Sequence, residues 1–221
     1  MLTEHEIKHI HPEFSANSET WDYHYRSYMG GNEYRRGAYL RKYLNEEAAP
    51  GDQYGQRLTN TALQNHVKSI VHIYRSYLFR VPPTRSLKNT VALPDVQAFM
   101  LDTDLKGTDI NAFMKQIQDS LMVYGSMWLI VDRPAYRTLT RAEELNLGIR
   151  AYVNSYVPSN VLDWEYEATV SGKQNLTMLK IIEHSGEDQD QLVVWYPEKV
   201  ERYWVEKEQF TKTMMAKGSL G

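Results

Sequence analysis

The chain contains no cysteine. This excludes disulfide bonds, thiolate metal sites and a cysteine nucleophile, and it is typical of proteins assembled in a reducing cytoplasm. Long hydrophobic runs are also absent, because none reaches the roughly 18 residues that a membrane-spanning helix requires. The segment Met1–His5 lacks the basic start and apolar stretch of a secretory signal. These absences predict a cytosolic protein with no membrane partner.

Common catalytic motifs are missing as well. The sequence has no G-x-S-x-G elbow, no phosphate-binding Walker A loop and no G-x-G-x-x-G turn. These motifs carry acyl transfer, nucleotide hydrolysis and dinucleotide binding in their common forms. We therefore expect no enzyme activity, no catalytic residue and no cofactor.

One enzyme pattern is present near the N-terminus. The run His5-Glu6-Ile7-Lys8-His9 satisfies the H-E-x-x-H pattern of zinc metalloproteases. That chemistry needs both imidazoles on one helix face, a carboxylate base and a third ligand. Pro12 follows the pattern closely and would limit a helix there. The conceivable third ligand, Glu33, lies beyond Gly30-Gly31, which would break the helix that presents it. We favour a chance match in a polar arm, and we therefore predict no metal site. A zinc metalloprotease is the less favoured alternative.

The bulk composition is that of a folded protein. Hydrophobic residues make up 42% and charged residues 24% of the 221 residues, enough for one large domain or two small ones. Sixteen tyrosines and five tryptophans stand out. Such rings suit surfaces buried against a partner, but they are also frequent in β-sheets. The aromatic content leaves both interpretations open.

Charge is divided unevenly along the chain. The net charge is only −3, yet residues 57–88 contain six basic residues and no acidic one. Residues 163–208 contain eleven acidic residues against five basic ones. This division predicts a dipolar protomer whose basic face meets the acidic face of a neighbour, or a polyanion. A solvated charge pattern without function is the alternative.

Hydrophobic periodicity predicts one long helix over Gln56–Val81. Steps of three and four residues place one apolar stripe on a single face, formed by Leu63, Val67, Ile70, Tyr74, Tyr77 and Val81. Pro82-Pro83 ends the helix. Arg57, Lys68 and Arg75 fall outside the stripe and predict a basic outer face.

The remaining pattern predicts an α+β fold, with a helical N-terminal half followed by a mostly antiparallel β-sheet. Residues 1–20 are expected to form an arm with at most a short helix, and short helices are expected over 21–28 and 35–47. Asp109 is expected to cap a helix that ends at Gly125, and the apolar run 126–131 predicts a strand buried on both faces. Further strands are predicted over 150–157, 161–166, 176–184, 191–196 and 200–205.

Basic residues interleave with tyrosines between Tyr23 and Tyr43. Such a tract contacts either nucleic acid, through phosphates and stacked bases, or carboxylates of a neighbouring subunit. We favour the subunit contact, because the acidic second half of the chain supplies carboxylates that can pair with these basic residues. The candidate contact residues are Arg35, Arg36, Arg41, Lys42, Arg57, Lys68, Arg75, Arg80 and Arg85.

Several stretches, in this order, resemble the N-terminal half of a family of tailed-bacteriophage portal proteins. They are Tyr54–Pro83 with its Tyr-Arg-Ser-Tyr-Leu-Phe-Arg-Val-Pro-Pro end, Leu121–Gly125 leading to Leu129–Pro134, Thr140–Glu144, and Tyr156–Trp164. Each stretch is short, so their order and spacing carry the resemblance.

The resemblance implies a structural protein that forms a ring, usually of twelve subunits, at one capsid vertex, through which phage DNA is packaged and ejected. It implies docking of the large terminase of the packaging motor, of the head–tail connector or adaptor, and of the major capsid or scaffolding protein. It also implies nonspecific contact with double-stranded DNA, and a place in the virion after assembly in the host cytoplasm.

The resemblance also gives a domain prediction. Residues 1–53 would form an N-terminal arm with short helices, and residues 54–221 a wing-like α+β domain, in what we expect to be the N-terminal part of a longer portal chain. Another head–tail connector or coat-associated phage protein is the alternative identity.

Overall fold

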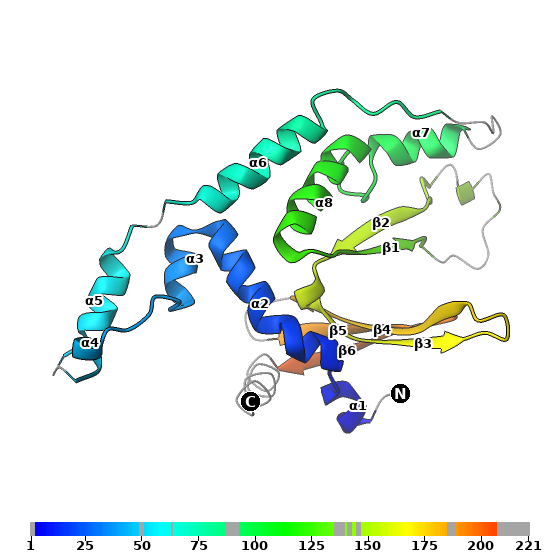
Figure 1. Cartoon of the computed structure of the whole chain (residues 1–221). Helices are drawn as coiled ribbons and strands as arrows, with labels where there is room; N and C mark the ends of the chain where they lie inside the picture. Colours follow the sequence, from blue (N-terminus) through cyan, green and yellow to red (C-terminus); the bar gives the residue numbers. More distant parts are fainter. Residues whose placement is uncertain are drawn as a thin grey trace. The chain divides into compact units, whose positions relative to one another are not determined.

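The computed structural model describes residues 3–48, 51–62, 64–86, 93–134, 140, 143–144, 147–184 and 189–206. These residues form two compact units (Figure 1). Unit 1 comprises the described residues of Met1–Asp22 and Val157–Gly221, and unit 2 those of Tyr23–Tyr156. Helices dominate the first half of the chain and antiparallel sheets follow, which confirms the predicted α+β class. None of the helices in the described ranges is long and apolar enough to cross a membrane.

Unit 1 is built on a four-stranded antiparallel sheet in the order β3-β4-β5-β6. Its strands are β3 (Val161–Ala168), β4 (Gln174–His184), β5 (Gln189–Trp195) and β6 (Val200–Glu206), and a 3-10 turn, η1 (Pro158–Asn160), precedes β3. These strands confirm the predictions made from alternating and continuous apolar runs. Strands consecutive in sequence are neighbours in the sheet, as hairpin connections require.

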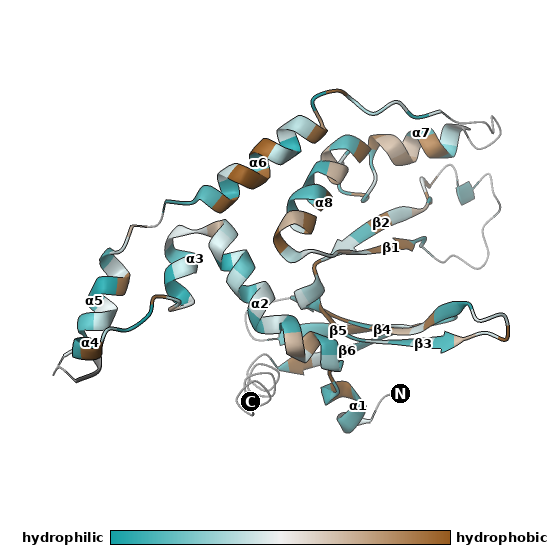
Figure 2. Ribbon diagram, viewed as in Figure 1, coloured by the Kyte–Doolittle hydropathy of each residue, from teal (hydrophilic) through white to brown (hydrophobic). Residues whose placement is uncertain are grey.

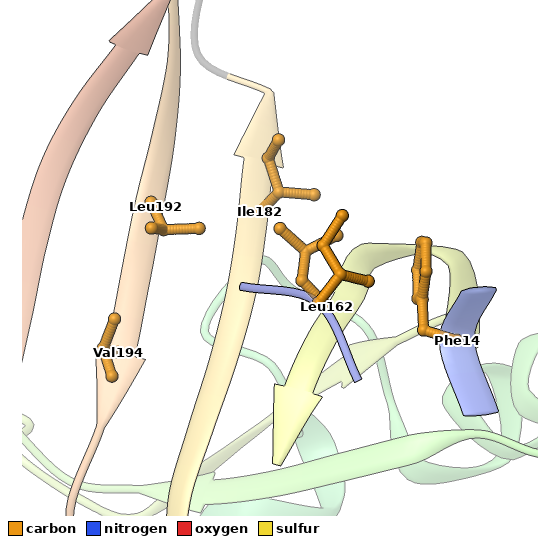
Figure 3. Packing of buried hydrophobic residues seen from close by; sticks show 6 residues of the cluster. Phe14, Leu162, Ile182, Leu192 and Val194 are labelled. Atoms are coloured by element: carbon orange, nitrogen blue, oxygen red, sulfur yellow. The ribbon is translucent and has the colours of Figure 1, made fainter. Parts of the chain in front are cut away.

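The N-terminal segment covers this sheet. Helix α1 (Glu4–Lys8) and the start of α2 (Pro12–Met29) bring Ile10 and Phe14 against buried residues of β3, β4 and β5. Figure 3 shows this packing around Leu162 and Ile182. Each fully buried aliphatic side chain of this kind contributes about 1.5–3 kcal/mol to folding, so the cluster fastens the N-terminus to the sheet.

The expectation of at most a short helix over residues 1–20 was wrong. Proline is tolerated in the first turn of a helix, where its missing N–H has no intrahelical partner. Pro12 is the first residue of α2, an 18-residue helix. The separate short helix expected over 21–28 is the second half of the same helix.

Unit 2 contains α3 to α8 and a two-stranded antiparallel sheet of β1 with β2. The helices are α3 (Gly31–Arg36), α4 (Leu44–Ala48), α5 (Gln53–Asn60), α6 (His66–Leu78), α7 (Leu93–Leu101) and α8 (Ile110–Tyr124), and the strands are β1 (Trp128–Asp132) and β2 (Tyr152–Tyr156). Helix α8 confirms its prediction. Asp109 accepts hydrogen bonds from the first backbone amides, and Gly125 ends the helix in the left-handed conformation, at φ +80°.

The single helix predicted over Gln56–Val81 was wrong, because the segment forms two helices, α5 and α6. Asn65 begins the second helix. Its side-chain carbonyl accepts from the Lys68 amide at 2.9 Å, and its side-chain amide donates to the Tyr28 carbonyl at 2.7 Å. Asparagine competes well for such capping positions, so a polar residue within the apolar period divides the helix. Leu63 of the predicted stripe lies outside the described residues.

The core of unit 2 is small. Phe113, Ile117 and Val153 form its buried cluster, with Phe99 and Met127 packed against it. The strand predicted to be buried on both faces, β1, alternates instead: Leu129 is 49% and Val131 71% exposed. That prediction was wrong, because an apolar run of this length gives no information about what covers each face. Among the described residues, most of the exposed large hydrophobic side chains belong to unit 2.

Candidate functional site

The H-E-x-x-H residues are used for structure at the start of the chain. The Glu6 carboxylate accepts from the Thr3 amide and the Thr3 hydroxyl, each at 2.7 Å, and these hydrogen bonds lower the pKa of Glu6. His9 follows the end of α1 in an extended conformation. His5 and His9 therefore do not share one helix face. Within the described ranges no group of three or more histidine or acidic side chains is placed to hold a metal ion.

A buried lysine lies where α1 meets the sheet. The Lys180 side chain on β4 is 1% exposed, and its ammonium forms an ion pair with Asp163 of β3 at 3.3 Å. The same ammonium donates to the carbonyls of Glu6, at 2.9 Å, and His9. Asp163 also contacts the His9 ring nitrogen at 2.8 Å. Since helix ends leave carbonyls without partners, Lys180 serves as a cap for α1.

A cavity of about 380 Å³ opens beside this cluster. It is lined by His5, Glu6, His9, Asp163, Glu165, Met178, Lys180 and Tyr196. The Lys180 amine donates to two backbone carbonyls and pairs with a carboxylate, so the cluster fastens α1 to the sheet. The sequence analysis missed it, although a lone lysine inside the apolar run Met178–Ile182 was a usable signal.

In unit 2, Arg57 holds the loop around α4 together. Its guanidinium binds both carboxylate oxygens of Glu46, at 2.6 and 2.8 Å, and donates to the Arg41 carbonyl at 2.8 Å. It also lies over the Tyr43 ring, 4.4 Å from the centroid. The hydrogen bonds from Arg57 and from the Tyr43 amide lower the pKa of Glu46 to about 2. The predicted contact residue Arg57 therefore has an internal partner.

Other predicted contact residues of this region also have partners within unit 2. Arg35 donates to the Thr61 carbonyl at 2.9 Å, and Arg36 pairs with Glu33 at 2.5 Å. Lys42 lies over the Tyr54 ring, 5.1 Å from the centroid. The Arg36 side chain is nonetheless 71% exposed. These residues of the basic and aromatic tract thus make contacts within unit 2.

Helix α6 packs on the rest of unit 2 through the side that carries Val71, His72 and Arg75. Val71 is buried, His72 contacts the Tyr28 hydroxyl at 3.4 Å, and Arg75 forms an ion pair with Asp119 of α8. Burial and the nearby Asp119 carboxylate raise the pKa of Tyr28. Arg75 was predicted to lie on a basic outer face, and this was wrong, because its guanidinium faces α8.

The apolar side of α6 faces away from these contacts. We call it the α6 apolar face; its members are between 43% and 73% exposed, and they are Val67, Ile70, Ile73, Tyr74, Tyr77 and Leu78. Figure 2 shows hydrophobic residues along this helix. A monomeric protein rarely leaves a contiguous apolar face in water without a binding role. The face is therefore the candidate interaction site of the chain.

Basic residues occur on α6 and in the segment that follows it. Lys68 is exposed and lies over the Tyr28 ring, 5.7 Å from the centroid, and Arg80 is exposed just after the helix. Arg85, also exposed, donates to the Asn111 side chain at 2.9 Å. No acidic residue occurs between Arg57 and Lys88 in the sequence. Lys68 and Arg85 are thus directed toward other parts of unit 2, and Arg80 is the cation that follows directly after the face.

Comparison with models of known protein families and with curated proteins finds no match for this chain.

Proposed function

We propose that this chain is a structural subunit of a tailed-phage portal, which assembles into a ring at the capsid vertex. The α6 apolar face carries the proposal, because its hydrophobic side chains are 43–73% exposed on a folded unit. Burial of such a face between copies would contribute about 25 cal/mol per Å² of apolar area. A repeated contact between unlike surfaces closes into a ring when the rotation per subunit permits.

The resemblance to portal proteins supports the same proposal through the positions of its stretches. Three of the four stretches fall on described elements: α5 and α6, the end of α8 with β1, and the connection from β2 through η1 to β3. The ring that the resemblance implies would dock the large terminase, the connector and the coat or scaffolding protein. The proposed subunit makes and breaks no substrate bond, and it contacts DNA without regard to sequence.

Negative-stain electron microscopy of the purified chain tests the proposal. A ring with a central hole is the expected image, and native mass spectrometry of the same sample gives the subunit number. A subunit number other than the twelve that is usual for portals would favour a connector or coat-associated protein. A chain that remains monomeric at high concentration would exclude a ring-forming subunit.

A further inference from the structure

The two units differ in the size of their apolar cores. The buried cluster of unit 1 joins the N-terminal segment to three strands through six side chains, those of Ile10, Phe14, Leu162, Ile182, Leu192 and Val194. The buried cluster of unit 2 has three members among the described residues, Phe113, Ile117 and Val153, although unit 2 is the longer of the two in sequence. Burial of apolar surface is the dominant favourable term in folding, so unit 1 is packed more strongly.

The helices and strands of unit 2 are also weak by themselves. Helices α3, α4 and α5 have six, five and eight residues, and isolated helices shorter than about 12–15 residues are marginal in water. Strands β1 and β2 form a sheet of two strands, whereas the sheet of unit 1 has four. Two strands alone are marginally stable, and independent stability needs three or more strands or packing against a helix. The order of these elements therefore depends on their contacts with the rest of the fold.

Several of those contacts are polar. Arg75 joins α6 to Asp119 of α8, and Arg150 pairs with Asp102, just after α7, at 2.8 Å. These four side chains are between 14% and 33% exposed, and ion pairs that keep contact with water contribute little to stability. The second carboxylate oxygen of Asp119, Oδ1, is buried and has no hydrogen-bond partner among the described residues, which costs free energy. Such contacts orient the elements of unit 2 but do not replace a larger apolar core.

We propose that unit 2 opens as a separate part of the chain while unit 1 stays folded. Regions with few buried apolar contacts open at a lower free energy than the core of a protein. A molecule that binds only the closed form of unit 2 would lower the population of its open form by mass action, so binding controls the order of unit 2. This inference concerns the single chain and holds whether or not copies form a ring, so the two proposals can fail independently.

Amide hydrogen exchange of the native chain, read by mass spectrometry without denaturant, tests the separate opening. The measured quantity is the protection of the slowest-exchanging amides in α8, which carries the core of unit 2, and in β5, which pairs on both sides within unit 1. The slowest amides of α8 should be at least about tenfold less protected than those of β5. Equal protection in the two elements, or greater protection in α8, would overturn the proposal.

Two matched isoleucine-to-valine variants distinguish this opening from unfolding of the whole chain. Ile182→Val in the core of unit 1 should lower the protection of the β5 amides by about two- to tenfold. It should leave the α8 amides unchanged, because unit 1 is folded in both the closed and the open form of unit 2. Ile117→Val should lower the protection of the α8 amides by a comparable factor. A fall in α8 protection in Ile182→Val as large as the fall in β5 would show that the units unfold together and would refute the proposal.

Discussion

Replacement of Lys180 by methionine tests the structural account of unit 1. Methionine has a similar length but no charge, so the Asp163 carboxylate, 5% exposed, loses its ammonium partner, and the carbonyls of Glu6 and His9 each lose a hydrogen bond. Removal of one partner of a buried ion pair costs about 3–5 kcal/mol. Asp163 keeps its contact with the His9 ring nitrogen at 2.8 Å. We therefore expect the free energy of unfolding to fall by an amount near the lower value, about 3 kcal/mol.

Urea unfolding followed by tryptophan fluorescence measures this loss, because Trp164 packs against the core cluster of unit 1. Linear extrapolation gives the free energy of unfolding in water. In a thermal melt the same loss corresponds to a midpoint lower by roughly 6–12 °C for a chain of this size. The double variant Lys180→Met with Asp163→Asn should recover part of the loss, since it leaves no unpaired charge.

Lys199→Met is the matched control. The Lys199 side chain is 58% exposed and pairs with Glu201 at the surface, so its replacement should change stability little. A Lys180→Met chain that unfolds within about 0.5 kcal/mol of the native chain would refute the view that the buried ammonium holds α1 to the sheet.

Two further predictions concern unit 2. The Glu46 pKa lies at about 2, below the ordinary 4.5. A depressed folded-state pKa gives stability that is fully present above pH 4.5 and is lost as the pH falls through about 2. Glu46→Gln should therefore melt below the native chain at pH 7, and this difference should shrink as the pH falls toward 2. A native-to-variant difference that persists unchanged at pH 2 would contradict the Glu46–Arg57 pairing. Asn65→Ala removes the cap of α6 and should lower the free energy of unfolding in urea by about 1 kcal/mol. Asn60→Ala, at the end of α5, serves as its control. Equal losses in the two variants would contradict the division of the helix at Asn65.

Helix α8 and the strands of unit 1 followed from local signals in the sequence. Asp109 and Gly125 marked both ends of α8, and the alternating runs located the strands of unit 1. Local chemistry also explains the failure at Asn65, since an apolar period gives no weight to a single capping side chain within it. The ends of elements depend on such individual hydrogen bonds, which a pattern averages out.

The candidate site was less accessible from sequence. Periodicity found the stripe that contains Ile70 and Tyr77, but it measures how apolar residues are arranged and not what covers them. Arg75 and Arg57 were expected to face a partner, yet Asp119 and Glu46, distant in sequence, pair with them. Long-range pairing of this kind depends on the tertiary fold, as does the burial of Lys180.

The central claim is that the α6 apolar face joins copies of this chain. Native mass spectrometry of the chain and of its Tyr77→Asp variant tests it most directly, with Ser69→Asp on the adjoining polar side of α6 as the control. Tyr77 is 73% exposed, so a charge there should leave the thermal midpoint unchanged while converting rings to monomers. Rings that persist in Tyr77→Asp, or a native chain that forms none, would contradict the claim.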